Sequence, residues 1–104
     1  MSKFFLEVSQ KQRVDVIGTL NESATDVWIA LHGYGQLVEY FQRHFRSMVT
    51  PARAFVFPQG AHKFYLQGTG GRVGASWMTK EDRLTDIENQ RLYLNEICRW
   101  VLSE

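Results

Sequence analysis

The apolar positions of this chain form short strand-like runs, with helical spacing in two longer stretches. Val27 to Leu31 are five apolar residues in succession, which is typical of a strand buried on both faces. A second apolar run ends at Phe57 and is closed by Pro58. The pattern predicts strands over 3–9, 12–19, 27–31 and 53–57.

The first two of these ranges are expected to pair as an antiparallel hairpin. Polar Gln10 and Lys11 separate them and suit a turn. Val14 and Val16 alternate with polar neighbours, which indicates a half-buried strand at the edge of a sheet.

A helix is predicted over 37–48. Leu37, Phe41, Phe45 and Met48 recur at spacings of four, four and three and so share one helical face. Pro51 ends this helix, because a residue before proline is driven out of the α region.

A second helix is predicted over 80–102. Thr79 and Asp82 have the spacing of a capping box, with Thr79 as the N-cap. The apolar stripe of this helix consists of Leu84, Ile87, Leu94, Ile97, Cys98 and Val101. We therefore expect Cys98 to pack in the core.

Residues 58–78 contain five glycines and are expected to form a long loop, functional or mobile. The predicted order is then β-β-β-α-β-loop-α in a single domain. Strands alternating with helices favour an α/β fold with a mostly parallel sheet, extended by the antiparallel N-terminal hairpin.

Composition narrows the class of protein. A hydrophobic content of 44% is a globular value, and 12 basic against 11 acidic side chains leave a net charge of +1. Such a charge provides no field to attract nucleic acid or an anionic membrane, and favours a small or neutral partner. The first seven residues do not resemble a signal peptide, no run reaches membrane-spanning length, and a lone cysteine suits a reducing compartment. We expect a cytoplasmic protein.

Three short motifs occur in a recognisable order. They are Leu31-His32-Gly33-Tyr34-Gly35 after the third strand, Phe57-Pro58-Gln59-Gly60 after the fourth, and Gly74-Ala75-Ser76-Trp77 before the last helix. Together they resemble the N-terminal half of an α/β-hydrolase of the phospholipase/carboxylesterase, acyl-protein-thioesterase-like group, over residues 12–104. The resemblance implies half of a three-layer sandwich in which strand 53–57 lies between strands 12–19 and 27–31.

The resemblance also assigns roles to single residues. The backbone N–H of Tyr34 would donate to an oxyanion, with Gly33 and Gly35 giving the loop room. Gly35 and Trp77 would contact substrate, although Trp77 could equally anchor the loop on the core. His32 would hold the loop in place by hydrogen bonds and would not act as a base.

The parts that react in this family do not occur in the sequence. There is no Gly-x-Ser-x-Gly elbow, and Ser76 has Met78 where the second glycine would stand. Ser76 is therefore expected to be a loop hydroxyl. The 104-residue chain alone is predicted to be inactive, since acyl transfer by this route needs an activated serine.

Other chemistry has little support in the sequence. His44 and His62 are expected at the surface, and three histidines without paired spacing give no zinc signature. The glycine-rich run 67–74 does not end in the lysine that a phosphate-binding loop needs. No metal and no cofactor are expected.

Two functions follow. The first is a serine hydrolase of carboxylic esters or thioesters, to which this chain contributes the oxyanion-hole half. The second is a non-catalytic, hydrolase-derived chain that binds a ligand or partner. In both cases strand 27–31 is expected to be covered by the missing C-terminal half or by a second chain, because unpaired strand edges recruit other chains.

Overall fold

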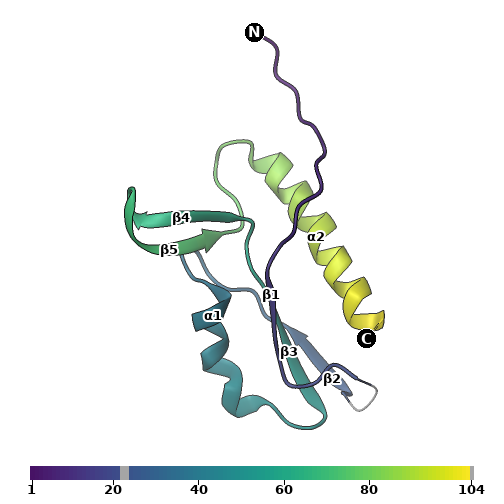
Figure 1. Cartoon of the computed structure of the whole chain (residues 1–104). Coiled ribbons are helices and arrows are strands. Elements are labelled where there is room, and N and C mark those ends of the chain that lie inside the picture. The colour runs from purple at the N-terminus through teal and green to yellow at the C-terminus, as the bar shows by residue number, and fades with distance from the viewer. Residues whose placement is uncertain (22–23, 104) are drawn as a thin grey trace.

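The chain is a small mixed α/β protein, seen here as a computed structural model that describes residues 1–21 and 24–103 (Figure 1). Its elements are β1 (Val14–Ile17), β2 (Asp26–Ile29), α1 (Val38–Phe41), the 3₁₀ helix η1 (Gln42–Met48), β3 (Arg53–Pro58), β4 (His62–Gln67), β5 (Gly70–Ser76) and α2 (Arg83–Ser103). Residues 22 and 23, in the polar connection before β2, lie outside the described residues. Neither α1 nor α2 has the length and hydropathy of a membrane span within the described ranges.

The central sheet has the strand order β1-β3-β2. β1 pairs antiparallel with β3, and β2 pairs parallel with it. The prediction that strand 53–57 lies between the other two is confirmed. The prediction of a mostly parallel sheet is wrong: among the strand pairs of the described residues, only β2–β3 is parallel, and the β1–β3 and β4–β5 pairs are antiparallel.

One face of β3 carries the main core. Phe55 and Phe57 are at most 2% exposed and form a cluster with Val38. Phe41 and Phe45 pack against this cluster, with ring centroids 5.2 to 5.9 Å from one another and from Phe57. Phe41 and Phe45 of the expected helical face thus cover the sheet, but only Val38–Phe41 is α-helical, and the seven residues Gln42–Met48 form a 3₁₀ helix that is unusually long.

The other face of β3 is buried as well. Ala54 and Val56 are fully buried, and they point away from Phe55 because successive strand residues face opposite sides. Figure 1 shows α2 along the side of the sheet away from α1. Of the stripe predicted for α2, only Ile97 is buried, and the prediction that Cys98 packs in the core is wrong because its side chain is exposed.

The glycine-rich segment 58–78 is not the long loop that was predicted. β4 and β5 form a hairpin in it, with pairs that run from His62 opposite Ser76 to Gln67 opposite Gly70. Gly68 turns the chain between the strands at φ +65°, a conformation that glycine adopts without a steric penalty.

The predicted strand 3–9 is also wrong. Residues 1–13 contain no regular secondary structure, and Phe4, Leu6 and Val8 are largely exposed. A strand needs a neighbour to accept its backbone hydrogen bonds, and β1 pairs with β3 instead of with this segment. The N-terminal hairpin is therefore absent from the described structure.

The predicted capping box before the last helix does not form. α2 begins at Arg83, and Asp82 precedes it at φ +53° with its carbonyl accepting the N–H groups of Thr85 and Asp86. The Thr79 hydroxyl donates to the carbonyl of Glu81 instead of capping a helix.

Candidate functional site around the loop after β2

The Leu31–Gly35 motif forms a tight turn at the carboxyl end of β2. The Ala30 N–H donates to the Val56 carbonyl at 2.9 Å and prolongs the parallel pairing. The turn closes through Gln36, whose N–H donates to the Gly33 carbonyl and whose Oε1 accepts the Gly33 N–H at 2.6 Å. Gly35 has φ +78°, so the chain reverses at a position that favours glycine.

The hairpin holds the far side of this turn. The Gly35 N–H donates to the Ala75 carbonyl, and the Ala75 N–H donates to the Gln36 carbonyl. The two backbones are so close that a Cβ on Gly74 would lie 2.4 Å from the Gly35 carbonyl oxygen. The lack of a side chain at Gly74 therefore allows the backbones of β5 and the turn to come this close.

His32 holds the near side of the turn and is 3% exposed. Its Nε2 accepts the Gly60 N–H at 2.9 Å, so the proton is on Nδ1, which donates to the Gly33 carbonyl at 2.8 Å. Both ring nitrogens are thus engaged by the backbone. Neither is open to accept a proton from an incoming group.

Trp77 packs against the same turn. Its ring stacks on His32 with centroids 5.2 Å apart, and its Nε1 donates to the His32 carbonyl at 3.0 Å. Gln90 of α2 donates to the Trp77 carbonyl at 2.6 Å. These contacts make Trp77 an anchor between the turn and α2, while a contact of Trp77 with substrate stays a prediction.

Tyr34 is the outermost residue of the turn. Its side chain is 76% exposed and lies on Phe64 of β4, with centroids 5.2 Å apart. Its backbone N–H makes no hydrogen bond to any residue that the structure describes. The turn thus presents the Tyr34 N–H, unpaired, on a scaffold that is held from both sides. The N–H groups of Leu31 and His32 also make no hydrogen bond to a described residue.

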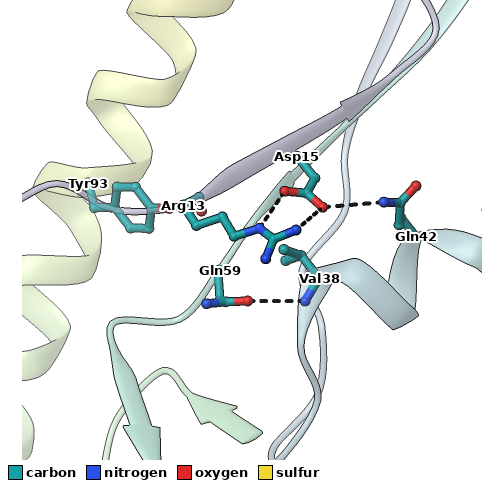
Figure 2. A network of polar contacts seen from close by, with 6 residues as sticks. All are labelled: Arg13, Asp15, Val38, Gln42, Gln59 and Tyr93. Atoms are coloured by element: carbon teal, nitrogen blue, oxygen red, sulfur yellow. Dashed lines mark hydrogen bonds and ion pairs between the residues drawn. The ribbon is translucent and has the colours of Figure 1, made fainter. Parts of the chain in front are cut away.

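A polar network positions the start of α1 beside this turn (Figure 2). Gln59 accepts the Val38 N–H at 3.3 Å through Oε1, and its own N–H donates to the Arg13 carbonyl. The Arg13 guanidinium pairs with Asp15, which also accepts from Gln42 at 3.3 Å. Only Gln59 was part of a sequence motif; nothing in the linear pattern indicated the rest.

Tyr93 connects α2 to that network. Its hydroxyl donates to the Arg13 carbonyl at 3.1 Å. Burial raises the pKa of Tyr93 to about 12, because the phenolate would lose hydration. Tyr93 therefore acts as a neutral donor at physiological pH.

Ser76 ends β5 in a closed environment. It is 2% exposed, and its Oγ has no hydrogen-bond partner in the described structure. Within residues 1–21 and 24–103, no serine hydroxyl donates to a histidine ring. Ser76 therefore lacks the base that a nucleophile needs.

The remaining histidines lie outside the turn. His62 is on β4, with its Nε2 3.2 Å from a carboxylate oxygen of Asp86. His44 is exposed on η1. No group of three or more His, Cys, Asp or Glu side chains suited to a metal ion occurs in the described parts of the chain.

Beside the turn lies a hollow of about 520 Å³. It opens between α1, η1 and the β4–β5 hairpin, and Gly35 forms part of its wall. The other walls include Tyr40, Phe41, His44, Leu66 and Arg72. Trp77 is not among the residues that line it.

Comparison with known proteins gave no matching family model, no matching curated protein and no matching solved structure. What the fold and the site define is a small mixed α/β protein with two small sheets, and a rigid glycine turn at the carboxyl end of a parallel strand.

Proposed function

We propose that this chain is the oxyanion-hole half of a serine hydrolase that cleaves carboxylic esters or thioesters. The assignment is to the α/β-hydrolase superfamily, in its phospholipase/carboxylesterase, acyl-protein-thioesterase-like group. The observation that carries the proposal is the unpaired N–H of Tyr34 on a turn that His32 and Ala75 hold from two sides.

The position of the turn supports the proposal. It follows the carboxyl end of β2, and the carboxyl end of β3 leads to Gly60, whose N–H holds His32. In open α/β sheets, ligands bind at the carboxyl ends of parallel strands. The order β1-β3-β2 is also the one that the resemblance implies for these strands.

The chemistry assigned to the turn is electrostatic. When a nucleophile attacks an ester carbonyl, the oxygen gains negative charge, and a fixed N–H stabilises it without reorganising. Removal of one such donor typically costs about 10²–10³ in rate. The nucleophile, its base and the second donor would come from outside residues 1–104.

A second candidate is a non-catalytic, hydrolase-derived chain that binds a partner. The observation in its favour is the edge strand β2, which exposes Val27, Trp28 and Ile29. For either function we place the protein in the cytoplasm. This placement rests on its one cysteine, Cys98, which is free and exposed.

The test compares the protein purified from its source with the 104-residue chain. Both are treated with a fluorophosphonate probe, the labelled residue is mapped by mass spectrometry, and hydrolysis of a p-nitrophenyl ester is followed. The hydrolase proposal expects an unlabelled 104-residue chain and a source protein labelled on a serine outside it. A source protein without label or turnover favours the binding chain, and a label on Ser76 contradicts the assigned site.

A further inference from the structure

The hollow beside the turn has the size of a small-molecule site. Its volume of about 520 Å³ falls within the usual range for ligand pockets, about 300–1,000 Å³. Three separate segments build it: the turn through Gly35, the α1–η1 helix, and the hairpin. A ligand in it would therefore lie directly beside the residue that follows Tyr34.

The wall is mixed, and its apolar part comes from both the helix and the hairpin. Tyr40 and Phe41 line it from the helix, and Leu66 and Val73 line it from the two strands of the hairpin. Tyr40, Leu66 and Val73 are 55%, 38% and 37% exposed. These side chains would lose water when an apolar group enters, which is favourable.

The charge of the wall has one sign. Arg72 is the charged side chain among the residues that line the hollow, and no Asp or Glu lines it. The guanidinium of Arg43 lies 5.0 Å from the ring centre of Tyr40, on the same helix. The hollow therefore combines an apolar part with a positive border.

Arg72 is one of several arginines without a carboxylate partner among the described residues, and of these it is the one that lines the hollow. Arg13, Arg53 and Arg91 each pair with a carboxylate, whereas Arg72 makes no ion pair or hydrogen bond to any described residue. Its planar set of N–H donors suits a carboxylate, which it can bind through two parallel hydrogen bonds.

We propose that the hollow binds a small amphiphile with a medium-length apolar chain and one carboxylate, with the carboxylate at Arg72. The binding itself does not depend on catalysis. The role of this binding in a reaction does rest on the proposed function. In that case the substrate would be an ester or thioester that carries the carboxylate at a position other than the bond that is cleaved.

The test measures binding in the whole protein by isothermal titration calorimetry, with sodium octanoate and 1-octanol as probes. The two share an apolar chain and differ in charge. We expect octanoate to bind at least about tenfold more tightly than octanol, because one charge-assisted hydrogen bond contributes a difference of that size. Added salt should reduce the difference, because the wall is partly open to solvent.

Three variants identify the contact. Arg72→Leu should remove the preference for octanoate and leave octanol binding unchanged, while Arg72→Lys should retain part of it. Arg46→Leu is the control, since Arg46 is exposed on η1 and does not line the hollow. Equal binding of the two probes, no binding of either, or an equal loss in Arg46→Leu would overturn the proposal. Octanoate binding in a protein without esterase activity would leave this site standing and contradict the proposed function alone.

Discussion

At the scale of single residues, the backbone and the side chain of Tyr34, in the turn after β2, have different surroundings. The ring of Tyr34 is largely exposed on Phe64, whereas its N–H is unpaired on a fixed backbone. Catalysis of the proposed kind uses the N–H and not the ring. A pair of substitutions at this one position can therefore tell the two roles apart.

In a source protein that hydrolyses esters, Tyr34→Pro should lower kcat by about 10²–10³, because proline has no N–H to donate. Tyr34→Phe keeps the N–H and the ring contact with Phe64, so most of the turnover should remain. The readout is p-nitrophenyl ester hydrolysis, with circular dichroism to check that both variants are folded. Equal losses in folded variants would mean that the side chain, and not the N–H, is what matters.

Gly74 allows a second residue-scale prediction. A Cβ there would lie 2.4 Å from the Gly35 carbonyl oxygen, a backbone atom that cannot move aside alone. Gly74→Ala should therefore reduce the free energy of unfolding by about 1–3 kcal/mol, the usual cost of overpacking. Urea unfolding of wild type and the variant measures this difference in the free energy of unfolding.

Gly70→Ala is the matched control for that substitution. A Cβ at Gly70 would meet no atom within 4 Å, and an exposed substitution of this kind usually changes stability by no more than about 0.5 kcal/mol. A Gly74 variant as stable as the Gly70 variant would show that the turn and the hairpin are not in close contact.

The sequence predicted many residues of this site, but not the long-range contacts that join them. The three motifs located His32, Gly60 and Gly74, and the turn is where the apolar run ends. The hydrogen bond from Gly60 to His32 and the approach of Gly74 to Gly35 join residues that are 28 and 39 positions apart. Contacts of that kind depend on how the strands pair, which local patterns do not specify.

At the scale of elements, the β4–β5 hairpin shows why a glycine count misleads. Five glycines suggested a loop, yet segment 62–67 contains the aromatic residues Phe64 and Tyr65, which favour a strand, and Gly68 provides its turn. Gly74 lies inside β5 because another backbone approaches there, a recognised reason for glycine in a strand. The helices were predicted better, since their apolar spacing extends over several turns.

The attachment of α2 to the segment before β1 can be tested through Tyr93, which donates to the Arg13 carbonyl. Its pKa is raised by burial to about 12 in the fold and is close to 10 in an unfolded chain. The unfolded state therefore releases this proton first, so the stabilising effect is complete below about pH 10 and is lost between about pH 10 and 12. Stability measured by urea unfolding should fall across that window.

The variant Tyr93→Phe should be less stable than wild type at neutral pH, because it lacks the hydrogen bond to the Arg13 carbonyl. It should also show a smaller decline above pH 10. Tyr65→Phe is the control, since Tyr65 is about half exposed on β4. An identical decline in wild type and Tyr93→Phe would show that Tyr93 is not buried against the rest of the fold.

At the scale of the whole molecule, the chain is extended for its length. Its radius of gyration is 15.7 Å, against about 13 Å for a compact domain of this size. The N-terminal segment projects from the body in Figure 1, and most of the apolar side chains on α2, such as Leu84 and Leu102, are exposed. The spacing of apolar residues predicts which face of a helix is apolar. It does not predict whether other residues of the same chain pack against that face.

The most exposed part of the sheet is the outer edge of β2. β2 pairs with β3 on one side, and its other edge has no strand beside it among the described residues. Unpaired edges with apolar side chains recruit other chains. We expect the 104-residue chain to self-associate at micromolar concentration unless a further segment or partner covers residues 27–31.

Sedimentation velocity tests that expectation, with Val27→Lys as the variant, because a lysine on an edge strand opposes pairing. The variant should sediment as a smaller species than wild type while its circular dichroism stays the same. Val8→Lys is the control: Val8 is exposed in the N-terminal segment, away from the sheet, and its replacement should leave the association unchanged. If wild type is instead a folded monomer whose amides over residues 27–31 resist hydrogen exchange, the edge is covered within the chain, and the strand order implied by the hydrolase resemblance does not describe its surface.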